Sequence, residues 1–521
     1  MRILWSSVSP FVGSGYGMQT AVAAKRLRAM GHDVAIFCHY GLSGSQTDWG
    51  DIPLYPNNVG DYGDKSDQAW YEDFKADLLI TLVDIWVLRG MPSEMHWAPW
   101  MPVDSDPIPP LVLDAAKNCL GIVKPIAMSK FGLKQLNDNG VDAYYIPHTV
   151  NTKLFAPNPE TRERGRSRYN WKEKFVIGTI ATNQVERKNW NAAMQGVKLF
   201  ESMHPSEVVY YMHTDLTDSK GINLATLRKS LKMESYTFVP SITAMRKGIP
   251  QESMAATYNV FDVFLLPTKG EGFGIPLVEA QSTEIPIITT KCIAQEELMG
   301  GGWFIERLRP EWTTQSSWQF SCDPYEIAEK LELAYQAKKS GEILEIGRKA
   351  REKAMEYDED AIYNTYWPSV LADIEQRIKQ PRNMEGIQKW RLAFIPQGIV
   401  PRKVLDLGSG LTKPYQKYLE CLGEYIAVDN RANGDGIIKA DAHHLPFRDK
   451  EFGFVWCSEM LEHCKTPEKV VQEAKRVAKH GVILFSTPKT PAFRLDPDHK
   501  VIDPRKVKYA EMQSGDGMLS W

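Results

Sequence analysis

The sequence predicts an α/β protein in which three Rossmann-like units follow one another. Apolar runs of strand length alternate with amphipathic helical stretches through most of the chain. Glycine-rich turns follow several of these runs, which is where α/β folds present backbone N–H groups to a phosphate or a cofactor. The same pattern starts again after Pro381, so we expect a third unit beyond the first two.

The first unit is expected at residues 1–150. It begins with a strand at 2–6, the turn Gly13-Ser-Gly-Tyr-Gly17 and a helix from about 18 to 30. Further apolar runs predict strands at 33–39, 78–83, 121–127 and 143–146.

The second unit is expected at residues 151–380. Residues 151–172 are polar and rich in Arg and Pro, so we interpret them as a linker. Strands are predicted at 175–181, 208–213, 236–240, 260–267 and 285–289, followed by helices from 324 to 372. The third unit, at 385–521, has strand patterns at 403–407, 425–428, 452–457 and 481–486.

Composition limits the class of protein. A chain of 521 residues is too long for one core, which predicts two to four domains. Hydrophobic residues make up 43% and charged residues 24%, which argues against disorder. The net charge of −3 provides no general attraction to nucleic acid or to an anionic membrane, although it leaves a local basic patch open.

The cysteines and the apolar runs predict a soluble, cytoplasmic protein. The seven cysteines are scattered and form no Cys-x-x-Cys pair, which indicates reduced thiols without a disulfide framework or a zinc site. No apolar run approaches the roughly 18 residues of a membrane-spanning helix. The first five residues read as a strand, so no secretion signal is expected.

Two carboxylates eight positions apart are the most informative pattern. Glu271 and Glu279 follow a buried strand and enclose a glycine-bearing turn and an apolar run. The alternative is a capped surface helix with an ordinary acidic face. The stretch Glu271-Gly-Phe-Gly-Ile-Pro-Leu-Val-Glu279 resembles the E-x7-E signature of retaining glycosyltransferases of family 4, which have the GT-B fold of two Rossmann-like domains facing across a cleft.

This resemblance implies roles for several residues. Glu271 would face the donor sugar and Glu279 would bind the ribose of the nucleotide. The backbone N–H groups from Gly272 through Phe273 and Gly274 to Ile275 would face the donor. The GT-B fold also implies that the last helix, within 357–378, crosses back to the first domain.

A sugar-nucleotide enzyme must stabilise the diphosphate that departs. Gly15 and Gly17 precede a helix whose N-terminus could face that diphosphate, although a plain tight turn explains them equally well. The resemblance identifies Lys188 as the phosphate-contacting lysine. Arg187 would replace an arginine that the family has earlier in the loop; a solvated charge pair is the alternative.

Other matches are weaker. The family's usual His-Asp pair is absent, and Asp104 takes its place. The resemblance implies that Asp104 faces the sugar or the acceptor; the alternative is an aspartate that only caps the loop. His148, in Ile146-Pro-His-Thr-Val, is interpreted as structural. Glu296 and Glu297 lie where the family has a Glu near the donor, although they could cap a helix.

The third unit resembles class I methyltransferases, which bind S-adenosylmethionine. Five residues carry this resemblance: Asp406, Gly408 and Gly410 in the glycine-rich turn, Asp429 after the next strand, and Asp441. The usual third glycine is missing, and only 33 residues follow Pro488, so we expect an incomplete domain. A scaffold module remains an alternative to a working methyltransferase.

Together these patterns predict a retaining glycosyltransferase that uses a UDP- or GDP-linked sugar without a metal and acts on a glycan. Two alternatives stay open: an enzyme that glycosylates modified nucleic-acid bases, and a non-catalytic sugar-binding or scaffold protein.

Overall fold

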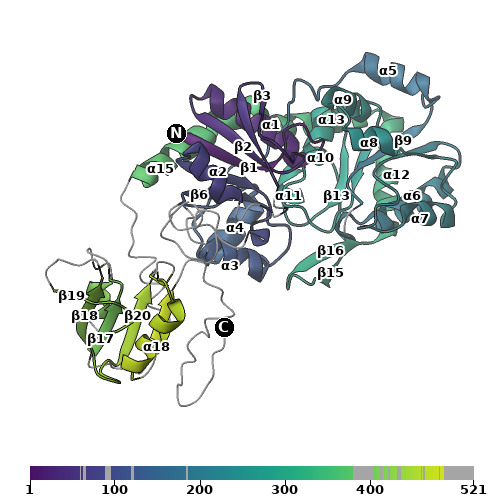
Figure 1. Ribbon diagram of the computed structural model, residues 1–521. Helices are drawn as coiled ribbons and strands as arrows, with labels where there is room; N and C mark the ends of the chain where they lie inside the picture. Colours follow the sequence, from purple (N-terminus) through teal and green to yellow (C-terminus); the bar gives the residue numbers. More distant parts are fainter. Residues whose placement is uncertain are drawn as a thin grey trace. The chain divides into compact units, whose positions relative to one another are not determined.

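The computed structural model contains two compact units, Met1–Gln380 and Pro381–Trp521 (Figure 1). The first spans the first two Rossmann-like units expected from the sequence, and the second spans the third. From here on, first unit and second unit mean these two compact units, and each is described by itself. A list of the residues that the structure describes is 1–58, 60, 62, 66–88, 95–118, 123–183, 186–379, 403–409, 413, 415–420, 423–430, 436–458, 460–461, 464–479 and 482–485.

The first unit holds two mainly parallel sheets. The eight-stranded sheet has the order β3-β4-β2-β1-β5-β6-β7-β8. Its strands are β1 (Arg2–Val8), β2 (Asp33–Tyr40), β3 (Thr47–Trp49), β4 (Ile52–Pro56), β5 (Leu78–Leu82), β6 (Trp97–Met101), β7 (Ile126–Ala127) and β8 (Tyr144–Tyr145). Only the β3–β4 pair is antiparallel among the described strand pairs of this sheet.

The six-stranded sheet has the order β11-β10-β9-β12-β13-β14. Its strands are β9 (Phe175–Ile180), β10 (Val208–His213), β11 (Thr237–Phe238), β12 (Val263–Leu266), β13 (Ile287–Thr290) and β14 (Gly302–Ile305). A separate antiparallel hairpin joins β15 (Leu308–Trp312) to β16 (Trp318–Cys322) and was not expected from the sequence.

Helices follow most strands. They are α1 (Gly15–Ala29), α2 (Ser66–Phe74), α3 (Pro110–Asn118), α4 (Lys130–Asp138), α5 (Pro159–Arg168), α6 (Trp190–Met203), α7 (Leu224–Ser230), α8 (Ile242–Lys247), α9 (Gln251–Asn259), α10 (Ile275–Ser282), α11 (Gln295–Leu298), α12 (Pro324–Ser340), α13 (Ile343–Met355), α14 (Glu359–Thr365) and α15 (Trp367–Lys379), with 3-10 turns η1 (Ile85–Val87) and η2 (Glu186–Lys188). No helix among the described residues has the length and apolarity needed to cross a membrane.

Helix α1 begins at Gly15, three residues earlier than the sequence indicated. The reason is its cap: the Ser14 hydroxyl accepts a hydrogen bond from the Gly17 backbone N–H at 3.1 Å. An N-cap serine satisfies a backbone donor that the first turn leaves unpaired. The glycine-rich segment is therefore partly the first turn of the helix.

The predicted linker at 151–172 is wrong, because residues 159–168 within it form the helix α5. Asn158 caps this helix, and Arg162 and Arg166, one turn apart, both bind the buried carboxylate of Asp262. The two arginines reverse the expected pKa effect of burying Asp262: burial raises its pKa, and the cations lower it below the ordinary value. This long-range ion pairing makes a polar segment helical.

Helix α15 lies beside the first sheet (Figure 1). Its Trp367 packs on Trp5 of β1 and Trp100 of β6, with ring centroids 6.2 and 5.6 Å away. All three rings are fully buried, so their apolar area contributes strongly to joining the last helix to the N-terminal sheet.

The second unit contains a five-stranded parallel sheet with the order β19-β18-β17-β20-β21. Its strands are β17 (Lys403–Leu407), β18 (Glu424–Asp429), β19 (Ile437–Lys439), β20 (Phe454–Ser458) and β21 (Val482–Phe485). Helix α17 (Gln416–Leu419) and the amphipathic α18 (Pro467–Val477) accompany them. The predicted strands of this unit are present, with ends shifted by one or two residues.

Candidate functional site

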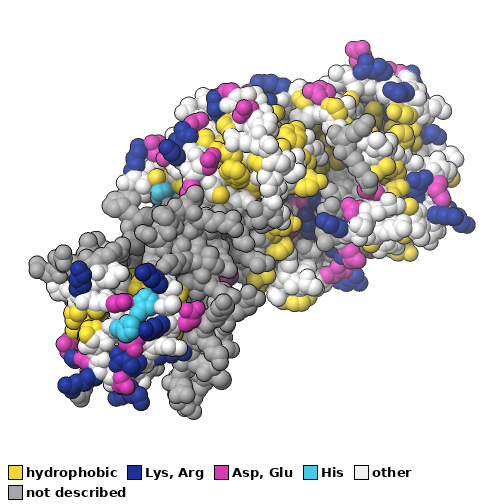
Figure 2. Space-filling view, in the orientation of Figure 1, with side chains coloured by type: hydrophobic (Ala, Val, Ile, Leu, Met, Phe, Trp, Pro, Cys, Tyr) yellow, Lys and Arg dark blue, Asp and Glu magenta, His cyan; other side chains and the backbone are white. Residues whose placement is uncertain are grey.

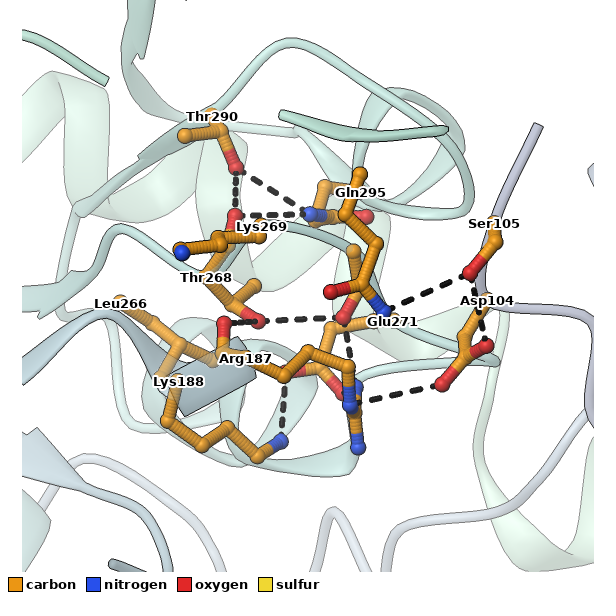
Figure 3. Close-up of polar contacts among 12 residues, drawn as sticks. Asp104, Ser105, Arg187, Lys188, Leu266, Thr268, Lys269, Glu271, Thr290 and Gln295 are labelled. Atoms are coloured by element: carbon orange, nitrogen blue, oxygen red, sulfur yellow. Dashed lines mark hydrogen bonds and ion pairs between the residues drawn. The ribbon is translucent and has the colours of Figure 1, made fainter. Parts of the chain in front are cut away.

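Glu271 stands at the centre of a charged cluster in the loop between β12 and α10 (Figure 3). Its side chain is 7% exposed. Lys188 Nζ donates to Oε1 at 2.6 Å, and Arg187 Nη1 donates to Oε2 at 3.0 Å. Burial alone would raise the pKa of Glu271, but the two cations lower it to about 2. Glu271 is therefore ionised at neutral pH.

Arg187 joins the two halves of the first unit, which are the first half with the eight-stranded sheet β1–β8 and the second half with the six-stranded sheet β9–β14. Its guanidinium donates to the Gly270 carbonyl at 2.5 Å and lies 3.4 Å from the carboxylate of Asp104, which follows β6. Figure 3 shows Asp104 entering from the first half, while Arg187, Lys188 and Glu271 belong to the second. The structure thus brings together Glu271, Lys188 and Asp104, the residues that the sequence nominated to act on the donor sugar, the phosphate and the acceptor.

The glycines beside Glu271 allow the two halves to approach closely. A Cβ atom on Gly272 would lie 2.4 Å from the Pro102 Cβ, and one on Gly270 would lie 2.3 Å from the Asp104 carbonyl oxygen. Gly274 has φ +113° and is the N-cap of α10, a backbone conformation that favours glycine. The Gly272–Ile275 amides therefore lie at a helix N-terminus against the first half.

Phe273 turns its ring inward. The ring is buried and packs edge-on against Tyr357 and His148. Only its backbone, and not its side chain, is thus suited to the donor-binding role that the resemblance implied.

Glu279 lies in α10 in a different environment from Glu271. It is 6% exposed, and the Tyr258 hydroxyl donates to its Oε2 at 2.7 Å. Burial raises the pKa of Glu279 to about 7, with the Tyr258 hydrogen bond acting in the opposite direction. One carboxylate oxygen is already engaged, which leaves Oε1 for a further donor.

The two glycines nominated in the first turn of α1 have different surroundings. A Cβ on Gly15 would meet Ile275 Cδ1 at 3.5 Å, so Gly15 lies next to the start of α10. A Cβ on Gly17 would lie 2.2 Å from the Val12 carbonyl oxygen of its own loop. Local packing accounts for Gly17, whereas Gly15 lies where the halves meet.

The sequence interpretation missed Asp84 and Tyr16. Asp84 follows β5, next to β6 in the sheet, and burial together with the Asp104 charge raises its pKa to about 6. Burial, and then the charges of Asp84 and Asp104, raises the pKa of Tyr16. The signal was available, because an acid directly after a predicted parallel strand lies at the edge where α/β folds bind ligands.

The residues nominated from the methyltransferase resemblance lie in the second unit. Asp406 is 1% exposed and accepts a hydrogen bond from the Tyr425 hydroxyl at 2.7 Å; burial raises its pKa to about 7. Gly408 has φ +78°, and a Cβ there would lie 2.5 Å from Met460 Cγ.

The remaining nominated residues of this site lie farther along the chain. Asp429 is buried at the end of β18, whereas Asp441 is exposed and accepts from the His443 backbone N–H at 2.9 Å. Gly410, Leu411 and Thr412 lie outside the described residues. The buried acids and the constrained glycine fit a cofactor that carries ribose hydroxyls and positive groups. No group of three or more His, Cys, Asp or Glu side chains in the described part of the chain could hold a metal ion.

Two family matches decide what these sites belong to. Residues 224–317, which include Glu271 and Glu279, match glycosyl transferases group 1, and residues 405–486 match a methyltransferase domain. The chain carries a group 1 glycosyltransferase domain and a methyltransferase domain. The resemblances found in the sequence are thereby confirmed.

Parts of the chain are also similar to curated proteins. A GDP-mannose-dependent α-(1-6)-phosphatidylinositol monomannoside mannosyltransferase from Mycolicibacterium smegmatis is 28% identical over 151 residues, 28% of this chain. The chain spans 37% of that relative's length and 49% of another curated relative's length.

Solved structures confirm the GT-B fold of the glycosyltransferase domain. A glycosyltransferase from Rickettsia africae is 15% identical with a TM-score of 0.53, over 73% of this chain and 99% of that chain. Anabaena HepE in complex with UDP-glucose is 14% identical with a TM-score of 0.55, over 71% of this chain and 100% of that chain.

Proposed function

We propose that the first unit is a retaining glycosyltransferase that moves a sugar from a UDP- or GDP-linked donor to a glycan acceptor. The observation that carries this proposal is the cluster of Glu271, Lys188 and Arg187 at the junction of the two halves. The mannosyltransferase relative is named as GDP-mannose-dependent, and HepE was solved with UDP-glucose, which supports this donor class.

The cluster can stabilise the charges that develop during transfer. The departing diphosphate gains negative charge, and Lys188 and Arg187 are the cations beside it. The anomeric carbon gains positive charge, and the ionised Glu271 carboxylate can face it. Retention then follows from attack on the face that the leaving group vacates, with the leaving phosphate oxygen accepting the proton of the acceptor hydroxyl. The protein contributes orientation and fixed charge.

The acceptor side is acidic. Asp84 and Asp104 follow adjacent strands of the first half, and each raises the pKa of Tyr16 through its charge. Carboxylates accept hydrogen bonds from hydroxyl groups and repel phosphates. This favours a polyhydroxylated glycan over a nucleic-acid acceptor. Figure 2 agrees: on the face shown, basic and acidic side chains are interspersed over the first unit, without a continuous basic stripe.

For the second unit we propose binding of S-adenosylmethionine, with methyl transfer left to experiment. Asp406 and Gly408 would lie beside the methionine part of the cofactor, and Asp429 would hold its ribose hydroxyls. The cofactor supplies an activated methyl group when bound. The buried Asp406 carboxyl, held by Tyr425, offers an acceptor for the cofactor's ammonium group.

A thermal-shift comparison tests both proposals on the full chain. UDP, GDP and ADP, UDP-glucose, GDP-mannose and S-adenosylhomocysteine are added separately. A ligand at 100 times its dissociation constant adds about 2.7 kcal/mol to the stability of the unit that binds it. We expect one nucleotide class to raise the melting temperature of the first unit. Absence of a shift with every UDP and GDP compound would refute the donor proposal, and absence with S-adenosylhomocysteine would refute the cofactor proposal.

Turnover completes the test. The nucleotide sugar that binds is incubated with wild-type protein, and release of its nucleoside diphosphate is measured with and without a panel of oligosaccharides. Acceleration by an oligosaccharide supports the transferase. Binding without release in any mixture would support the sugar-binding alternative.

A further inference from the structure

His148 is buried where the first half of the glycosyltransferase domain meets the Glu271 loop. It is 2% exposed and packs among three aromatic rings. Its ring centroid lies 4.5 Å from that of Trp100, 5.4 Å from Phe273 and 6.3 Å from Tyr16. Phe273 is two residues beyond Glu271, and Tyr16 is in the first turn of α1. The imidazole is thus enclosed by residues of both halves beside the charged cluster.

Neither ring nitrogen of His148 has a hydrogen-bond partner among the described residues. Every imidazole carries at least one N–H group, and a buried polar group without a partner is costly. A phenylalanine would fill this aromatic setting without that cost. Packing alone therefore leaves the identity of this side chain unexplained.

The backbone around His148 is held by buried side chains. Gln19 of α1 donates through Nε2 to the Thr149 carbonyl at 2.8 Å and accepts from the Thr149 N–H at 3.2 Å. On the other side, Trp100 Nε1 donates to the Ile146 carbonyl at 2.9 Å. These contacts fix the turn from both directions, so the imidazole is held in one place with its nitrogens unsatisfied.

We propose that His148 binds a hydroxyl group of the donor sugar through its ring nitrogens. This inference rests on the proposed glycosyltransferase function and adds a sugar-recognising residue to it. In the structure the nitrogens are shielded from solvent, so the sugar reaches them when a neighbouring aromatic side chain moves aside.

The chemistry of the ring favours a hydroxyl over a phosphate. Burial lowers the pKa of His148 to about 3, which keeps the imidazole neutral at physiological pH. A neutral imidazole has one donor and one acceptor nitrogen, and a sugar hydroxyl can pair with either. The diphosphate instead finds its cations in Lys188 and Arg187.

Two substitutions separate ligand binding from packing. His148→Phe keeps an aromatic ring and removes both nitrogens, whereas His148→Gln keeps a donor and an acceptor. Each variant is titrated calorimetrically with UDP, GDP, UDP-glucose and GDP-mannose. We expect His148→Phe to bind the free nucleoside diphosphate within twofold of wild type and the matching nucleotide sugar about tenfold more weakly, about 1.4 kcal/mol. His148→Gln should recover most of that loss.

The possible results separate the two proposals. Equal affinity of wild type and His148→Phe for the nucleotide sugar overturns the inference, as does an equal loss for nucleotide and nucleotide sugar. Failure of wild type to bind any of the four compounds refutes the proposed function instead. If His148→Phe does not fold, 15N-histidine spectra of wild type decide: the His148 signals, assigned with His148→Gln, must shift with the nucleotide sugar and not with the free nucleotide.

Discussion

Glu271 in the first unit and Asp406 in the second occupy similar places with opposite electrostatics. Both are buried acids near the carboxyl end of a central parallel strand, beside a glycine that its surroundings require. Lys188 and Arg187 flank Glu271, and its pKa is lowered to about 2. Asp406 has the Tyr425 hydroxyl and, in the part of its unit that the structure describes, no ion pair; its pKa is raised to about 7.

This contrast shows how similar α/β frames are adapted to different ligands. In the proposed function, the anionic diphosphate is matched by Lys188 and Arg187, and Glu271 would keep these cations in place before the donor arrives. In the proposed function, the sulfonium and ammonium groups of S-adenosylmethionine are matched by acceptors such as the Asp406 carboxyl. Strand order alone does not distinguish the two cases; the side chains at the loop do.

The largest effect is expected from removing the charges of the Glu271 cluster in the first unit. Glu271→Ala and Lys188→Ala should each reduce sugar transfer more than about tenfold, or roughly 1.4 kcal/mol of transition-state stabilisation. Transfer rates are measured with the nucleotide sugar that binds wild type.

The exposed residues Glu234 and Lys229, changed to Ala, provide matched controls, since each removes the same charge from the surface of the second half. Wild-type rates in both folded site variants would falsify the assignment. Circular dichroism confirms that the variants are folded.

The next largest effect is expected at Asp406 of the second unit. Since the pKa of Asp406 is raised from 3.8 to about 7, its protonated form is favoured in the fold. Its stabilising contribution is full below pH 3.8 and is lost as the pH rises through 7. Asp406→Asn, which still accepts from Tyr425, should therefore stabilise the second unit more at pH 8 than at pH 5, by roughly 2–3 kcal/mol, since one pKa unit corresponds to about 1.4 kcal/mol.

Hydrogen exchange of residues 403–407 in the full chain measures this difference, because exchange reports the opening free energy of one unit separately. Equal protection changes at the two pH values would show that Asp406 does not titrate in this range. The same variant should bind S-adenosylhomocysteine more weakly if Asp406 contacts the ligand.

Glu279 offers a comparison within the first unit. Its pKa is raised from 4.5 to about 7 by burial, so its stabilising contribution is full below pH 4.5 and lost as the pH rises through 7. Glu271 has the opposite sign: its contribution is present above pH 4.5 and is lost as the pH falls toward 2. Glu279→Gln should therefore raise the melting temperature relative to wild type increasingly between pH 5 and pH 8.

Scanning calorimetry at four pH values checks this trend, with Glu234→Gln as the exposed control. A constant difference across the range would mean that Glu279 keeps an ordinary pKa.

The smallest effect is expected at Tyr258. Tyr258→Phe removes one buried hydrogen bond to Glu279, which should cost about 1 kcal/mol of stability. If Glu279 holds the ribose, the loss of this hydrogen bond leaves the Glu279 carboxylate less firmly positioned. Nucleotide binding should then also weaken a few-fold. Calorimetric titration with the free nucleoside diphosphate measures this loss; unchanged affinity would separate Glu279 from the ribose.

Local patterns predicted a large part of the fold. The apolar run before Glu271 predicted β12, and the runs before Asp406 and Asp429 predicted β17 and β18, because parallel strands are apolar on both faces and need no distant partner to be recognised. Helix α5 was missed for the opposite reason. Its segment is polar, and what holds it is Asp262, about 100 residues away.

In the candidate site, too, some residues could be found from local patterns and others only from tertiary contacts. Glu271 and Lys188 could be nominated one by one, since each follows a predicted strand, and Asp104 could be nominated from its place in the family pattern. Asp84 directly follows the strand predicted at 78–83, but its place beside Asp104 depends on the order of β5 and β6 in the sheet. The unsatisfied nitrogens of His148 could not be foreseen, since they depend on which rings surround it.

Local periodicity and turn chemistry were enough to predict the α/β class, the glycine-rich loops after the main strands and the residue types at the ends of those loops. Contacts between residues far apart in the chain were needed to show that Arg187 joins Asp104 to Glu271, that Glu279 is buried against Tyr258, and that Asp406 lacks a cation among the described residues. Charge and burial depend on distances between residues far apart in the chain, and folding alone sets those distances.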